Sequence, residues 1–216
     1  MTSIVEHASS LLIGLATAVL IVTAAVLPFL SPQWVSFEQG RANATAWTGY
    51  TTAELDAATG AILSDLVLGP PDFDVAIAGE PVLEPRERGH MGDVRRVFIG
   101  LWVLAAASIM IVAVASRRPD RARMWRAIQR GALGLTGVVI AVGIVALVAF
   151  DALFELFHQV FFPAGSYTFD PGTERLVQLF PFQFWEETAL VVGVVIVVVG
   201  IALAAFAGRR ASSAGR

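Results

Sequence analysis

The chain has 216 residues, of which 56% are apolar and 15% charged, and its net charge is −3. Soluble domains carry roughly 25% charged residues, so the composition excludes an ordinary soluble protein and indicates a membrane protein. Cysteine is absent, which excludes disulfides, thiol nucleophiles, thiolate metal sites and palmitoylation on this chain. Lysine and the phosphate-binding and Gly-x-Ser-x-Gly motifs are also absent, so nucleotide and serine-nucleophile chemistry find no support.

Four apolar segments are long enough to cross a bilayer as helices. Each has close to the roughly 20 residues that cross the hydrocarbon core, and none contains an acidic or basic residue. For the first segment a secretory signal is the alternative. A permanent span is favoured because the flank before it has no basic residue and the apolar run exceeds about 15 residues. The spans cover residues 11–30, 97–116, 131–150 and 189–207.

These spans predict an all-α membrane protein with four transmembrane helices, folded as a single integral membrane domain of residues 1–216. Nine of the fifteen arginines lie between spans two and three or after span four. Basic loops face the cytoplasm and contact anionic lipids, so we expect both termini to be cytoplasmic in a bacterial cell membrane. Segments 31–95 and 151–188, with ten and six carboxylates, then form an extracellular cap.

The first outer segment contains an amphipathic helix. Thr52 is a possible cap for it, and apolar or small residues recur at helical spacing until Gly69 and the prolines after it end the pattern. Segment 31–95 is too short and too polar for a large core of its own, so we expect the helix to lie at the membrane interface. Residues 72–89 are expected to form loops or short strands. The stripe is made of Leu55, Thr59, Ile62 and Leu66.

His90 lies at the outer mouth of the second span. If a helix has begun there, Asp93 is one turn away and can orient the imidazole and raise its basicity. An interfacial histidine beside a helix-capping carboxylate is the structural alternative. Taken with the predicted topology, this histidine lies on the same outer side as His158.

The third span continues past Phe150 with a polar face. At 100° per residue, Asp151, Glu155 and His158 fall within about 60° of one another on a helix. Such a face can relay protons, bind a divalent metal, or extend into water at a helix end. The metal interpretation is weak because the Glu-x-x-His motif of di-metal bundles occurs once here.

The remaining outer segment is broken after Phe162 by Pro163 and Gly165. A turn-like element follows at residues 167–171, and residues 176–185 are apolar and aromatic. Such a stretch beside a span is typical of an interfacial belt or a re-entrant segment, and lining a lipid-binding groove is the alternative.

Two sequence boxes resemble a known membrane family. They are Glu87-Arg-Gly-His-Met-Gly-Asp-Val-Arg95 and Leu156-Phe-His-Gln-Val-Phe-Phe162, the second followed by Tyr167-Thr-Phe-Asp-Pro171. In this order, and after the outer amphipathic helix, they resemble the four-span family that includes the bacterial lipoprotein intramolecular transacylase. The resemblance covers nearly the whole chain.

The resemblance implies an enzyme that moves an acyl chain from the glycerol of a diacylglyceryl lipoprotein to the α-amino group of its N-terminal cysteine. The resemblance also implies that the family's histidines correspond to His90 and His158 of this chain. Two imidazoles suit this exchange, because the amine loses a proton and the glycerol oxygen gains one. We expect Asp93 to orient His90, Glu155 or Asp170 to support the site, and an oxyanion donor among Tyr167, Arg175 and the backbone near Gly165.

Exchange of an ester for an amide needs no nucleotide, so we expect no cofactor and no metal. The expected partners are a diacylglyceryl lipoprotein or phospholipid substrate and membrane lipids, without nucleic acid, and the oligomeric state is left open. Two other functions stay open at this point: a metal-dependent membrane hydrolase built on Asp151, Glu155 and His158, and a non-enzymatic membrane scaffold.

Overall fold

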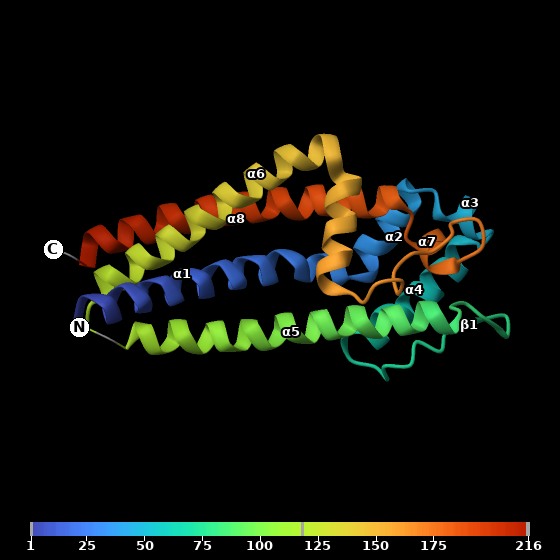
Figure 1. Ribbon diagram of the computed structural model, residues 1–216, viewed down its shortest axis with the longest axis horizontal. Helices are drawn as coiled ribbons and strands as arrows, with labels where there is room; N and C mark the ends of the chain where they lie inside the picture. Colours follow the sequence, from blue (N-terminus) through green and yellow to red (C-terminus); the bar gives the residue numbers. More distant parts are fainter. Residues whose placement is uncertain (1, 118, 215–216) are drawn as a thin grey trace. The chain divides into compact units, whose positions relative to one another are not determined.

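The computed structural model describes residues 2–117 and 119–214, with side chains from residue 6 onward. Arg118 and Arg216, two of the arginines used for the topology prediction, lie outside the described residues. Within them, four helices are long and apolar enough to cross a membrane (Figure 1). This confirms the prediction of an all-α protein with four spans. The helices are α1 (Thr2–Val26), α5 (Pro85–Ser116), α6 (Arg121–Phe161) and α8 (Phe182–Ala214).

Shorter elements connect these helices. The 3-10 helix η1 (Leu27–Leu30) follows α1. Two short strands, β1 (Ala76–Ile77) and β2 (Glu80–Pro81), form an antiparallel hairpin with Ala76 opposite Pro81. The prediction of loops or short strands is correct for this hairpin, but it is wrong after Pro85, where α5 begins. Proline suits the first turn of a helix because its missing N–H needs no partner there. The other elements are α2 (Pro32–Arg41), α3 (Ala44–Thr48), α4 (Thr52–Val67) and α7 (Arg175–Leu179).

The described chain forms two compact units. Unit 1 contains residues 1–26, 100–147 and 191–216, and unit 2 contains residues 27–99 and 148–190. Helices α5, α6 and α8 contribute residues to both units. Unit 2 corresponds closely to the two outer segments expected from the sequence. The single-domain description of residues 1–216 stays a prediction.

Small residues pack the helices of unit 1. A Cβ atom on Gly131 of α6 would lie 2.3 Å from the carbonyl oxygen of Gly14 of α1, so these backbones are in direct contact. A Cβ atom on Gly200 of α8 would likewise meet Oγ1 of Thr136. Close approach at small residues is the usual way in which membrane helices associate, because lipid offers no hydrophobic drive for burying large side chains.

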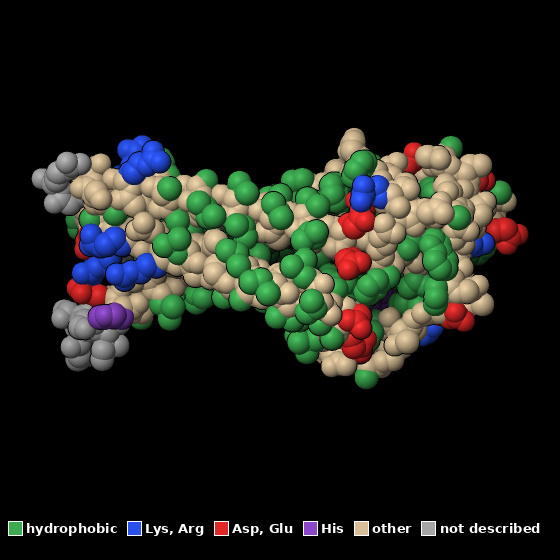
Figure 2. All heavy atoms as spheres, turned by 90° about the horizontal axis from the view of Figure 1, so that it is seen from above, with side chains coloured by type: hydrophobic (Ala, Val, Ile, Leu, Met, Phe, Trp, Pro, Cys, Tyr) green, Lys and Arg blue, Asp and Glu red, His purple; other side chains and the backbone are tan. Residues whose placement is uncertain are grey.

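Most large apolar side chains of unit 1 lie on the outside of its helices. In the most apolar window of α6, 6% of the residues are buried, and Leu147 is 72% exposed. Figure 2 shows basic side chains gathered at the end of unit 1 that carries the termini, and apolar side chains along the helices. An apolar outer surface with charge confined to one end is the arrangement that a lipid environment favours.

Helix α4 has the predicted apolar stripe, but its N-cap is different. The side chain of Thr51, not Thr52, accepts a hydrogen bond from the backbone N–H of Glu54, whose carboxylate accepts from the N–H of Thr51. Thr51 has the extended backbone conformation that this capping box needs, whereas Thr52 is already helical. The helix ends at Val67, close to the predicted end at Gly69.

The stripe of α4 does not lie on a membrane surface. Leu55, Ile62 and Leu66 are buried in the core of unit 2 with Phe73 of the following loop and Leu179 of α7. What the structure contradicts is the expected place of this helix at the membrane interface, because residues 148–190 supply apolar partners that complete a core with it. The same packing corrects the interfacial-belt interpretation of residues 176–185, since several of them are buried in this core. The buried ones are Leu176, Leu179, Phe180 and Phe184.

Helix α6 is interrupted near its last quarter. Ala149 has φ −148° and ψ 41°, which is not helical, and helical geometry resumes after it through Phe161. The sequence predicts that the helix continues past Phe150, and the structure shows that it does so only after this kink. The kink therefore changes the direction of the helix just before the polar face that begins at Asp151.

Candidate active site

His90 lies in the second turn of α5 and its side chain is buried, with 7% of its surface exposed. Its Nδ1 atom is buried and has no hydrogen-bond partner among the described residues. Native proteins pair most buried polar atoms, so an imidazole with an unpaired one is a candidate for a functional role.

His158 lies three residues before the end of α6. Its Nδ1 atom is 2.7 Å from the backbone carbonyl oxygen of Phe154, four residues earlier. A carbonyl only accepts, so Nδ1 carries the hydrogen and Nε2 keeps its lone pair in the neutral ring. This is the tautomer of an imidazole that can take a proton at Nε2.

The two histidines face each other within unit 2. Their ring centroids are 6.0 Å apart and their planes differ by 21°. This distance lies within the roughly 10 Å across which two groups can serve one substrate bond, directly or through a water. The structure therefore brings together the two histidines that the sequence singled out.

Aromatic rings surround the pair. Phe162 contacts both rings, with centroid distances of 4.7 Å to His90 and 5.3 Å to His158. Phe169 contacts His90 at 5.5 Å, and Tyr167 contacts His158 at 5.2 Å. An apolar setting of this kind suits acyl chains and strengthens electrostatic interactions inside it.

Asp93 is one turn from His90 on α5, as expected, but its carboxylate accepts a hydrogen bond from Arg96. In this structure it makes no hydrogen bond to Nδ1 of His90. An orienting role for Asp93 therefore stays a prediction. The backbone hydrogen bond to Phe154 already orients the other ring, His158.

The four predicted supporting residues divide into two groups. Tyr167 donates a hydrogen bond from its hydroxyl to Glu155 at 3.2 Å, so these two lie beside His158. Asp170 accepts from the backbone N–H of Gly172, and stabilises the turn there. Arg175 donates to the carbonyl of Thr48 and to Gln178 and lies over the ring of Tyr50, so these contacts are structural and none of them is with a histidine.

The polar face of α6 forms no metal site. Among residues 2–117 and 119–214, no three His, Cys, Asp or Glu side chains are grouped so as to hold a metal ion. Asp151 is exposed, and the carboxylate of Glu155 accepts from Tyr167 and Gln159. The arrangement therefore gives the metal-dependent hydrolase no support.

Two residues in the first turn of α5, Glu87 and Arg86, position the site, although the sequence did not single them out as site residues. Glu87 is fully buried, and its carboxylate accepts hydrogen bonds from the backbone N–H groups of Glu84 and Leu176, at 2.7 and 2.6 Å. It thereby ties the start of α5 to α7. The sequence signal that could have identified Glu87 is a carboxylate in the first turn of a helix, one turn before a histidine.

Arg86 is the second positioning residue. It donates to the carbonyl oxygen of Thr168 at 2.7 Å, pairs with Glu174, and places its guanidinium 4.7 Å from the ring centre of Phe169. These contacts fix the segment that presents Phe169 to His90. Arg95 caps α4 in a similar way, since it donates to the carbonyl oxygens of Asp65 and Gly69 at the end of that helix.

Comparison with known proteins agrees with this fold. The structure aligns with that of the membrane-integral lipoprotein intramolecular transacylase Lit from Bacillus cereus, with a TM-score of 0.75 and 17% identity, over 98% of each chain. Two structures of that protein with one histidine replaced by arginine or alanine align with TM-scores of 0.76, also at 17% identity. They cover 98% of this chain and 94% and 96% of theirs. At this identity the likeness shows a common fold.

A sequence relative is known from Aquifex aeolicus (strain VF5). This uncharacterized protein is 30% identical over 127 residues, which is 57% of this chain. The chain spans about half of the relative's length, with 55% covered.

The fold and the histidine pair define a four-span, membrane-integral protein with an imidazole site in aromatic surroundings. The sequence model of the lipoprotein intramolecular transacylase family, Lit, matches residues 9–185. The chain belongs to this family, which is a family of enzymes. The predicted membrane acyltransferase is confirmed at the level of the family, and neither the metal-dependent hydrolase nor the scaffold is supported.

Proposed function

We propose that this protein moves one acyl chain within a diacylglyceryl lipoprotein, from a glycerol ester to the α-amino group of the N-terminal cysteine, and leaves a lyso-lipoprotein. The contact between His90 and His158 is the observation that carries the proposal. A bond between carbonyl carbon and amine nitrogen forms, and the bond to the glycerol oxygen breaks. The amine loses one proton and the glycerol oxygen gains one, so the reaction needs no other reactant.

The two histidines carry these protons. A free α-amino group has a pKa of about 7.7–8.0, so its ammonium form must be deprotonated before attack. His158 takes the proton at Nε2, because its Nδ1 hydrogen is held by the carbonyl of Phe154. His158 then passes this proton to the adjacent ring of His90, which donates it to the glycerol oxygen, so both imidazoles end the reaction neutral.

The proposal places unit 2 on the extracellular side and both termini in the cytoplasm. The arginines of the loop between α5 and α6 and those after α8 support this orientation by the positive-inside rule. On that side no nucleotide is available, which suits an exchange of ester for amide. A phospholipid is the alternative acyl donor, and membrane lipids are the expected surroundings.

The experiment is expression of the full chain in a host whose diacylglyceryl lipoproteins carry a free N-terminal amine. The N-terminal peptides are analysed by mass spectrometry. We expect N-acylated lyso-lipoprotein with unchanged total acyl mass, because transfer within one molecule conserves mass. The matched control is the His90→Gln/His158→Gln double variant, which should leave the diacyl form.

Other mass changes identify the other functions. An added acyl chain indicates a phospholipid donor, and a lost chain indicates a hydrolase. Peptides that stay unmodified while the protein is present in the membrane contradict the proposal. EDTA should leave the conversion unchanged, since proton transfer by imidazole needs no metal ion.

A further inference from the structure

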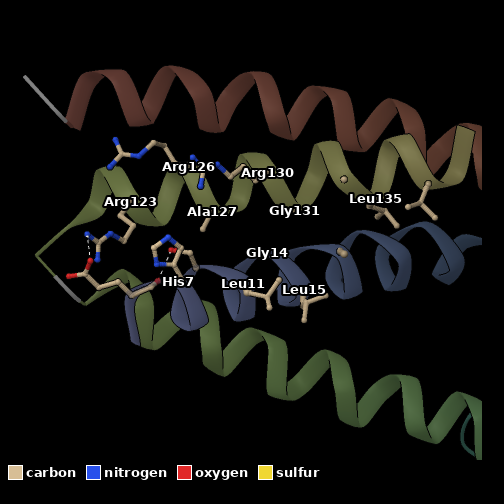
Figure 3. A pocket seen from close by; sticks show the side chains of 15 residues that line it. His7, Leu11, Gly14, Leu15, Arg123, Arg126, Ala127, Arg130, Gly131 and Leu135 are labelled. Carbon is tan, nitrogen blue, oxygen red and sulfur yellow. Dashed lines mark hydrogen bonds and ion pairs between the residues drawn. The ribbon is translucent and has the colours of Figure 1, made fainter. Parts of the chain in front are cut away.

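A groove lies between α1 and α6 in unit 1, distinct from the histidine site in unit 2 (Figure 3). Its volume is about 700 Å³, within the range of roughly 300–1,000 Å³ that is usual for small-molecule sites. Gly14 and Gly131, where the two backbones meet without side chains, both line the groove. The helices diverge on either side of a contact this close, which leaves room for a ligand.

One end of the groove is polar, with three arginines beside Glu6, His7 and Ser10, and the rest is apolar. Arg123, Arg126 and Arg130 line this end on α6 (Figure 3). The apolar part is lined by Leu11 and Leu15 of α1 and by Leu135 and Val138 of α6. Leu11, Leu15 and Val138 are 65%, 56% and 61% exposed, so this part opens to the lipid-facing outside of the helices. A ligand with a polar group joined to a hydrocarbon chain matches a groove with arginines at one end and an apolar wall along the rest.

The length of the groove matches one leaflet. Its lining on α1 runs from Glu6 to Ala18, which is about 18 Å at 1.5 Å per residue. Half of a hydrocarbon core of roughly 30 Å is about 15 Å. A lipid with its headgroup at the arginines therefore has room for one acyl chain along the apolar wall.

Of the three arginines that line the groove, two are not neutralised by any acidic residue that the structure describes. Arg123 is neutralised by Glu6 at 3.1 Å and by Asp120 at 3.3 Å. Arg126 and Arg130 are exposed and make no ion pair with any described residue. They are four residues apart on one face of α6, where like charges repel unless an anion lies between them.

We infer that this groove is a binding site for an anionic glycerophospholipid. Arg126 and Arg130 bind the phosphate, because guanidinium groups match phosphate oxygens in geometry as well as charge. One acyl chain lies against Leu11, Leu15 and Leu135. Basic pockets between membrane helices bind anionic headgroups in this way. The site holds a lipid that is neither donor nor acceptor in the acyl transfer, and it stands independently of the proposed function.

The test measures lipid binding to the purified full chain in detergent by native mass spectrometry. The probes are phosphatidylglycerol and phosphatidylcholine with identical acyl chains, and inorganic phosphate. We expect saturable binding of phosphatidylglycerol, much weaker binding of phosphatidylcholine, and no competition by phosphate at equal concentration. Competition by phosphate would instead identify a site for free anions.

Charge removal tests the headgroup contacts. Arg126→Gln/Arg130→Gln should weaken phosphatidylglycerol binding by more than tenfold, since each arginine near an anionic headgroup contributes about fivefold. The matched control is Arg117→Gln/Arg209→Gln, which removes two exposed charges that do not line the groove. Its binding should stay close to that of the unmodified chain.

Filling the groove tests the acyl chain contact. Gly134 lines the groove and a Cβ atom there would meet no atom within 4 Å, so Gly134→Leu adds an apolar side chain to the wall of the groove. Gly137 also has open space, on the same helix but outside the groove, which makes Gly137→Leu the control for helix stability. We expect Gly134→Leu to reduce phosphatidylglycerol binding and Gly137→Leu to leave it unchanged. Equal binding of both lipids, or unchanged binding in the arginine pair and Gly134→Leu variants, would overturn the inference.

Discussion

The imidazole rings of His90 and His158 lie 6.0 Å apart with nearly parallel planes, although the residues come from two different helices. One ring is buried with an unpaired Nδ1, and the other has its Nδ1 hydrogen held by a backbone carbonyl. Two imidazoles in such different surroundings suit different steps of one proton transfer.

His90→Gln and His158→Gln are each expected to lower the transacylase rate by about 10²–10⁴, since each removes a proton carrier. Lipoprotein mass spectrometry in the host described above measures the rate. The matched control is His7→Gln, which removes the third histidine, outside unit 2. If either site variant keeps full activity, the paired assignment is wrong.

Tyr167→Phe is expected to lower the rate by less than about tenfold. Its hydroxyl donates to Glu155, so it is not directed at a reacting oxygen in this structure. Loss of a true oxyanion donor costs about 10²–10³ in rate. The same assay distinguishes these outcomes, and a loss of the larger size would assign Tyr167 to the oxyanion.

Glu87→Gln is expected to destabilise the protein by about 1–3 kcal/mol. The carboxylate accepts from two backbone N–H groups, and an amide group has one accepting oxygen, so one buried donor loses its partner. Thermal unfolding in detergent measures the change. Glu80→Gln on the exposed hairpin serves as the control, and equal melting temperatures of the two variants would contradict this role.

Glu38 gives unit 2 a pH dependence. Burial, together with the hydrogen bond and charge of Glu187, raises the pKa of Glu38 from 4.5 to about 7, against the opposing charge of Arg41. The folded state therefore holds this proton more tightly than the unfolded state. The stability it contributes is fully present below pH 4.5 and is lost as pH rises to about 7.

Glu38→Gln keeps the uncharged form at every pH, so its advantage over the unmodified chain should grow between pH 5 and pH 8. Melting temperatures of both proteins at these two pH values check the sign. An advantage that shrinks over this interval would mean that Glu38 is ionised in the folded protein.

Topology is tested with single cysteines, because the chain has none. Arg121→Cys and Glu80→Cys are both at exposed positions. On intact cells, an impermeant thiol reagent should label position 80 and not position 121. The opposite result would place unit 2 in the cytoplasm and overturn the extracellular site.

The four spans and the stripe of α4 were predictable from the sequence because they depend on local properties. A run of about 20 uncharged apolar residues must be helical in lipid, since its backbone groups have no other partner there. The spacing of Leu55, Ile62 and Leu66 likewise determines one apolar face of a helix, whatever covers that face. The two histidines were also identified from the sequence.

Contacts between distant residues were decided by the tertiary structure alone. Periodicity does not say what covers a face, so the core formed by α4 with Leu179 and the hydrogen bond from the backbone N–H of Leu176 to Glu87 could not be derived. The separation of His90 and His158 depends on the break in α6 at Ala149 and on the packing around Phe162. An isolated helix favours neither the kink nor the burial of an imidazole, because the energy that stabilises both comes from the residues packed against them.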